Sequence, residues 1–210
     1  MRFFRHHVAL VSAYLPIAVA IAGCSRPAAP TTAAPAAAPA PPPAERGKVL
    51  VIAGGCNDCH TTKKMGPKGP EPDMSRMLAG HPEDIKITAP YKPAKGGFLG
   101  IGKGGHTNPW AIGVTETLTA WSGPWGVSFA ANLTPDPNTG LGGGVWTEDV
   151  FVKTLKTGKH MATSRDILPP MPWNWYSQLS EDDLKAIWAY LRTIPPIVNH
   201  VPDPIPPREN

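Results

Sequence analysis

Apolar side chains recur every three or four positions in three segments of the chain, and this spacing places them on one face of a helix. The three predicted helices cover residues 45–59, 147–160 and 180–196. Their apolar faces consist of Val49, Ile52, Ala53 and Cys56 in the first, Phe151 and Leu155 in the second, and Leu184, Ile187, Trp188 and Leu191 in the third. Thr147 and Ser180 are suitable N-caps, and Gly158 and Pro195 are suited to end the second and third helices.

The long segment between the first and second helices, residues 61–146, lacks such a pattern. It contains sixteen glycines and ten prolines, a composition typical of loops. It also carries Trp110, Trp121, Trp125 and Trp146, and side chains of this size need apolar surface to cover them. We therefore predict loops that wrap around a large apolar surface. The stretch AIGVTETLTAW, residues 111–121, could supply a short hairpin.

The N-terminal residues predict export. Arg2 and Arg5 precede an apolar stretch over residues 8–22, which is shorter than the roughly 20 residues that a membrane-spanning helix needs. Residues 1–23 are therefore predicted to be a signal peptide. The sequence IAGC at residues 21–24 resembles the bacterial lipobox, in which cleavage leaves a lipid-bearing cysteine as the first residue. We expect Cys24 to be lipidated, and the alternative is an ordinary signal peptide.

A tether is predicted to follow the lipidated cysteine. Residues 24–44 hold seven prolines and no core-forming side chains, so they are expected to be extended. The folded domain is predicted to cover residues 45–200, with a proline-rich tail over residues 201–210. Together these features predict a protein on the periplasmic side of a membrane, anchored there by lipid.

The net charge of the chain says little about its function. It is +4, and removal of residues 1–23 takes away two arginines, which leaves +2 and gives no sign of nucleic-acid binding. Lys63, Lys64 and Lys68 form a local cluster that could act as a basic rim for an acidic redox partner. A solvated loop is the simpler alternative.

The candidate chemistry lies at residues 54–60, GGCNDCH. The pattern C-x-x-C-H is the signature of covalent haem attachment, in which Cys56 and Cys59 form thioethers and His60 ligates the iron. A redox dithiol would leave His60 without a role. A zinc site would need further ligands, and Cys24 is the only other cysteine. Because the motif occurs once, we predict one covalent haem c.

The opposite side of the iron can be ligated by methionine or histidine, or it can stay open. Met171 lies in ILPPMPWNW, where three prolines stiffen the backbone. Such a loop presents a thioether with little conformational entropy left to lose, which favours Met171 as the distal ligand. Met161 and His160, in GKHMATS, are the alternatives.

These features together resemble the class I cytochrome c family, with CNDCH in the first helix, a late MPW, and LSEDDLKAIWAYLRTIPP at the end. The resemblance implies an all-α fold around one haem, with N- and C-terminal helices that cross. The long Gly/Pro-rich insertion is a departure from the small members of the family. It assigns haem attachment to Cys56 and Cys59, proximal ligation to His60, distal ligation to Met171, and packing on the first helix to Tyr190. Family members often orient the histidine ring with the carbonyl of a Gly-Pro pair, for which Gly66-Pro67 and Gly69-Pro70 are both candidates.

The resemblance implies an electron carrier and not an enzyme. Its partners would be redox proteins, with no small-molecule substrate and no nucleic acid. One alternative is the electron-accepting cytochrome subunit of a dehydrogenase or oxidase complex. Another is a gas or peroxide sensor, which would need an open or displaceable sixth iron position.

Overall fold

A computed structural model describes residues 41–91 and 112–207 of the chain. The predicted signal peptide, Cys24, the greater part of the predicted tether and residues 208–210 lie outside the described residues. No helix among those described is long and apolar enough to cross a membrane.

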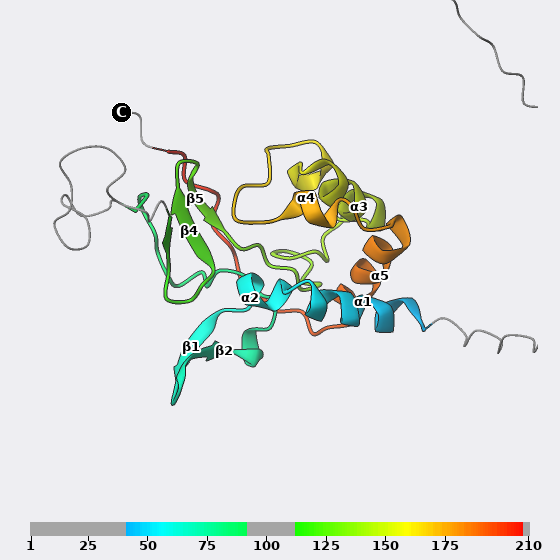
Figure 1. The fold of residues 1–210 in the computed structure, drawn as a ribbon, viewed down its shortest axis with the longest axis horizontal. Helices are drawn as coiled ribbons and strands as arrows, with labels where there is room; N and C mark the ends of the chain where they lie inside the picture. Colours follow the sequence, from blue (N-terminus) through cyan, green and yellow to red (C-terminus); the bar gives the residue numbers. More distant parts are fainter. Residues whose placement is uncertain (1–40, 92–111, 208–210) are drawn as a thin grey trace, which may run out of the picture. The chain divides into compact units, whose positions relative to one another are not determined.

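The first and last helices pack against each other (Figure 1). They are α1, Pro43–Ala53, and α5, Glu181–Leu191. α1 begins within the segment predicted as tether and ends before the cysteines. The prediction of one helix over residues 45–59 was wrong, because Gly55 adopts a left-handed conformation with φ 67° and starts a separate helix, α2, Cys56–His60. This break separates α1 from the motif, which lies on α2.

The other two predicted helices are confirmed, together with their N-caps and the glycine that ends the first of them. α3 covers Glu148–Thr157, with the Thr147 side chain accepting from the Val150 N–H and Gly158 left-handed at its end. The Ser180 side chain likewise accepts from the Asp183 N–H at the start of α5. α5 ends at Leu191, four residues before Pro195, so the proline does not set its end.

The all-α prediction was wrong. Within the described residues, five strands form two antiparallel sheets. The first sheet pairs β1, Lys63–Gly66, with β2, Gly69–Pro72, and the second has the order β3, Gly113–Val114, then β4, Ala120–Gly123, then β5, Gly126–Phe129. The hairpin predicted within residues 111–121 corresponds to β3 and the first half of β4.

The two tight hairpins share a physical cause. Both reverse on a Gly-Pro-Xaa-Gly tetrapeptide, residues 66–69 in the first and 123–126 in the second, with the two glycines paired across the turn. Proline fixes one backbone angle of the turn, and the last glycine takes a positive φ, 113° at Gly69 and 95° at Gly126. The insertion therefore forms two tight hairpins within the predicted loops.

Shorter elements complete the domain: two 3-10 turns, Met74–Arg76 and His160–Ala162, and the one-turn helix α4, Trp173–Tyr176. The apolar core lies between α1, α3 and α5 and includes Val51, Phe151, Leu155, Leu184, Ile187 and Leu191. The described part of the predicted tail joins the second sheet, because Ile205 and Val127 exchange backbone hydrogen bonds of 2.8 and 3.0 Å.

Candidate haem-binding site

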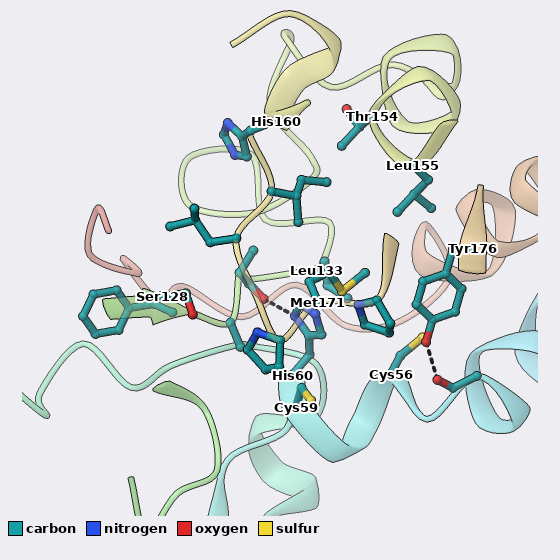
Figure 2. Close-up of a pocket in the computed structure, with 18 of the residues that line it drawn as sticks. Cys56, Cys59, His60, Ser128, Leu133, Thr154, Leu155, His160, Met171 and Tyr176 are labelled. Atoms are coloured by element: carbon teal, nitrogen blue, oxygen red, sulfur yellow. Dashed lines mark hydrogen bonds between the residues drawn. The ribbon is translucent and has the colours of Figure 1, made fainter. Parts of the chain in front are cut away.

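The two cysteines and the histidine of the motif lie on the five-residue helix α2. Its first turn closes through a hydrogen bond from the Asp58 N–H to the Gly55 carbonyl, 2.9 Å. Cys56 and Cys59 are three residues apart, so both project from the same side of the helix. Both thiols are free and partly buried, and both open into one cavity (Figure 2).

This cavity has a volume of about 400 Å³ and is lined mainly by apolar side chains from α1, α3, α5 and the loops between them. Val51, Leu133, Phe151, Leu155, Ile187 and Leu191 are among them. Cavities of this size and character are typical of sites for cofactors and small molecules. The structure brings Cys56, Cys59, His60 and Met171, which were predicted as one site, to the wall of this same cavity.

His60 is held in a defined orientation. Only 9% of its surface is exposed, and its Nδ1 lies 2.8 Å from the carbonyl oxygen of Ala131. Burial lowers the pKa of the imidazole, so the neutral ring is favoured. In the neutral ring that donates from Nδ1, the other nitrogen, Nε2, carries a lone pair that can ligate a metal.

The carbonyl that orients His60 was not anticipated. The prediction placed this role on Gly66-Pro67 or Gly69-Pro70, but both pairs belong to the hairpin turn of β1 and β2. Ala131 follows β5 and is 71 residues away from His60 in the sequence. No local sequence signal could have identified it, because the contact depends on how the second sheet packs beside α2.

The structure separates the candidates for the distal position. Met171 lines the cavity and packs against the apolar core, and His160 also lines the cavity. Met161 is not among the lining residues and takes a left-handed conformation with φ 50°. Distal ligation by Met171 stays a prediction, and the alternatives stay His160, which lines the cavity, and Met161, which does not.

Tyr176 is a site residue that the sequence analysis missed. It lies on α4, lines the cavity, and donates a hydrogen bond from its hydroxyl to the carbonyl of Gly54 at the end of α1. Burial raises the pKa of the phenol to about 12. The bond joins the segment that carries Met171 to the chain just before Cys56 (Figure 2). Tyr190, predicted to pack on the first helix, does lie against Gly47 of α1.

The environment of the cysteines argues against the redox-dithiol alternative. Burial raises the pKa of the Cys56 thiol to about 11 and also raises that of Cys59. Redox-active dithiols instead depend on a lowered thiol pKa, since the thiolate is the reactive form. For the zinc alternative, no cluster of three or more His, Cys, Asp or Glu side chains that could hold a metal occurs among the described residues.

Two of the three lysines that follow the motif form contacts within the chain. Lys63 donates to the carbonyl of Asn57 at 3.0 Å, and the Lys64 ammonium lies 3.8 Å from the carboxylate of Asp73. Lys68 is exposed at the tip of the hairpin. The basic rim for an acidic partner therefore rests mainly on Lys68 and stays a hypothesis.

The residues present fit a covalently bound haem. Two free thiols line the cavity wall, where each could form a thioether, and His60 presents one free ring nitrogen. The apolar lining suits a porphyrin face. Among the described residues that line the cavity, Arg165 is the only lysine or arginine. Its positive charge could form an ion pair with a carboxylate of the porphyrin.

Comparisons with known proteins point the same way. No family model matches the chain. It is 28% identical to the fructose dehydrogenase cytochrome subunit of Gluconobacter japonicus over 193 residues, 92% of this chain and 29% of that protein. It is 33% identical to the cytochrome c subunit of the quinone alcohol dehydrogenase of Gluconobacter oxydans (strain 621H) over 103 residues, 47% of this chain and 20% of that protein. It is 38% identical to the gluconate 2-dehydrogenase cytochrome c subunit of Pantoea cypripedii over 68 residues, 32% of this chain and 14% of that protein.

The cavity, the C-x-x-C-H turn and these relatives all point to the class of c-type cytochromes. The chain is similar to the cytochrome c subunits of dehydrogenases. It spans less than a third of the length of each of the three relatives above.

Proposed function

We propose that this chain carries one haem c and transfers single electrons as the cytochrome component of a membrane-associated dehydrogenase system. The observation that carries the proposal is the convergence of Cys56, Cys59, His60 and Met171 on one apolar cavity. A haem bound there supplies a one-electron couple between ferrous and ferric iron. The single C-x-x-C-H motif supports one haem in this chain.

The chain's own residues set the conditions for that couple. Cys56 and Cys59 would fix the cofactor to α2, and His60 offers a ring nitrogen whose direction is set by the Ala131 carbonyl. Met171 offers a neutral thioether from the opposite segment. The apolar lining keeps water from the site, which disfavours extra charge on the metal and so favours the reduced state.

Haem attachment can be tested directly. The chain is produced in a host that assembles c-type cytochromes, and haem that remains on the denatured polypeptide is measured by in-gel peroxidase staining and by mass. We expect one haem per chain, reduced attachment in the Cys56→Ser and Cys59→Ser variants, and none in the double variant. A wild-type polypeptide without covalent haem would refute the proposal.

The partner is proposed from the relatives. Three of them are named as cytochrome subunits of fructose, alcohol and gluconate dehydrogenases, which supports a dehydrogenase as the electron donor of this chain. Affinity purification of the tagged chain from its native host should recover a dehydrogenase, and addition of that enzyme's substrate should reduce the haem. Recovery of the chain free of any dehydrogenase would favour a freely diffusing carrier instead.

We also propose that the chain is exported and anchored on the periplasmic side through lipid on Cys24. The support is the charged and apolar leader followed by IAGC. Metabolic labelling with a radioactive fatty acid should mark the wild-type chain and leave a Cys24→Ala variant unlabelled. Equal labelling of both would exclude this anchor.

A further inference from the structure

Gly80 occupies the point where the loop behind α2 meets the peptide that orients His60. Its N–H donates to the His60 carbonyl at 2.8 Å. Its φ is 80°, which favours glycine. A Cβ at this position would overlap the carbonyl oxygen of Ala130 and lie 2.7 Å from the carbonyl oxygen of Ala131, both closer than real Cβ contacts allow. The Ala131 oxygen is the one that accepts from Nδ1 of His60.

The backbone around Gly80 has little freedom to move away. On one side, the Leu78 N–H donates to the buried hydroxyl of Thr61 at 2.9 Å. On the other side, the Leu133 N–H donates to the Leu78 carbonyl at 2.8 Å, and the His81 N–H donates to the Ala130 carbonyl at 2.9 Å. Leu78 and Thr61 are both fully buried. A side chain at position 80 would therefore have to displace the peptide at residues 130–131.

We propose that Gly80 is a positioning residue for the proximal histidine. By lacking a side chain, it lets the Ala131 carbonyl reach Nδ1 of His60 while its own N–H holds the backbone carbonyl of the same histidine. The inference rests on the proposed function, in which His60 ligates iron. A hydrogen bond at Nδ1 raises the basicity of Nε2 and favours the oxidised metal, so this contact holds the reduction potential down.

The test compares Gly80→Ala with Gly69→Ala in the full, haem-loaded chain. Gly69 also has a positive φ, 113°, but a Cβ there would meet nothing within 4 Å, so it controls for backbone strain alone. The exchange rate of the His60 Nδ1 proton is followed by NMR in deuterated water, and the reduction potential is measured by redox titration. For Gly80→Ala we expect exchange about tenfold faster, as for loss of one hydrogen bond, and a higher potential. Gly69→Ala should match the wild type in both.

A second pair of variants decides the question if Gly80→Ala does not fold. Thr61→Val removes the acceptor for the Leu78 N–H and loosens the loop that carries Gly80, whereas Thr61→Ser retains it. Faster Nδ1 exchange in Thr61→Val, restored in Thr61→Ser, supports the inference. It is overturned if haem-loaded Gly80→Ala keeps the wild-type exchange rate and potential, or if both Thr61 variants do. Absence of covalent haem from the wild type would refute the proposed function itself, so the two failures are distinguishable.

Discussion

Gly47 of α1 packs directly on the backbone carbonyl of Ala186 in α5. A Cβ at position 47 would overlap that oxygen and lie 2.9 Å from the Cβ of Tyr190. The two helices can therefore approach this closely only because residue 47 is glycine. The contact has a consequence for the site, since α1 leads into Gly54, Gly55 and the helix that bears both cysteines.

Gly47→Ala should destabilise the fold. The added methyl group has no space against Ala186, and overpacking of this kind costs about 1–3 kcal/mol, partly offset by the better helix propensity of alanine. Chemical denaturation should show a lower unfolding free energy. Gly144→Ala is the matched control, because nothing lies within 4 Å of the added Cβ, and it should change stability by less than about 0.5 kcal/mol. Equal midpoints for the two variants would contradict the packing described for α1 and α5.

Met171→Ala should remove the distal ligand. We expect loss of the near-infrared sulfur-to-iron charge-transfer band in the oxidised protein and a lower reduction potential, because a thioether ligand favours ferrous iron. Met161→Ala is the control and should keep the band, since Met161 is not among the residues that line the cavity. If the band persists in Met171→Ala and disappears in Met161→Ala, the assignment must be reversed.

Arg165→Gln should lower the reduction potential. Arg165 lines the cavity, and a nearby positive charge disfavours ferric iron, so its removal stabilises the oxidised state. The expected fall is on the order of tens of millivolts for one charge partly screened by solvent. Lys153→Gln removes the same charge from an exposed position on α3 that does not line the cavity, and it should have a smaller effect. Equal shifts in the two variants would mean that only net charge matters.

The ion pair between α1 and α5 should make stability depend on pH. The Arg46 guanidinium donates to Asp183 at 2.9 Å, and this hydrogen bond lowers the pKa of the Asp183 carboxyl. A lowered folded pKa means that the pair stabilises the fold above the unfolded value of about 3.9 and that this contribution is lost as the pH falls through the folded pKa.

Asp183→Asn should therefore be slightly less stable than the wild type at pH 7, and the difference should shrink as the pH falls below about 4. The loss should be small because Arg46 is largely exposed. Asp182→Asn removes the same charge from the same helical turn without breaking the bond to Arg46, and it serves as the control. Denaturant unfolding at several pH values measures both. A stability difference that persists unchanged at low pH would rule out the carboxylate as its source.

The sequence by itself determined the features that depend on neighbouring residues. The N-caps at Thr147 and Ser180, and the left-handed glycine that ends α3, are local preferences, and the structure has all three. The haem-attachment motif is local too, because two thiols and an imidazole within one turn need no distant partner. The Gly-Pro-Xaa-Gly turns were equally local, but short strands without apolar alternation hid the hairpins on either side.

Only the tertiary structure decided what surrounds the motif. The Ala131 carbonyl reaches His60 across 71 residues, the Tyr176 hydroxyl reaches Gly54 across 122, and Met171 and Arg165 come to one cavity from a separate segment. Two of these contacts are made to backbone carbonyls, and the others come from a loop without a periodic side-chain pattern. Neither kind leaves a periodic signal in the sequence. Their positions follow from how α1, α5 and the second sheet pack together, and that packing is set by many weak apolar contacts distributed along the chain.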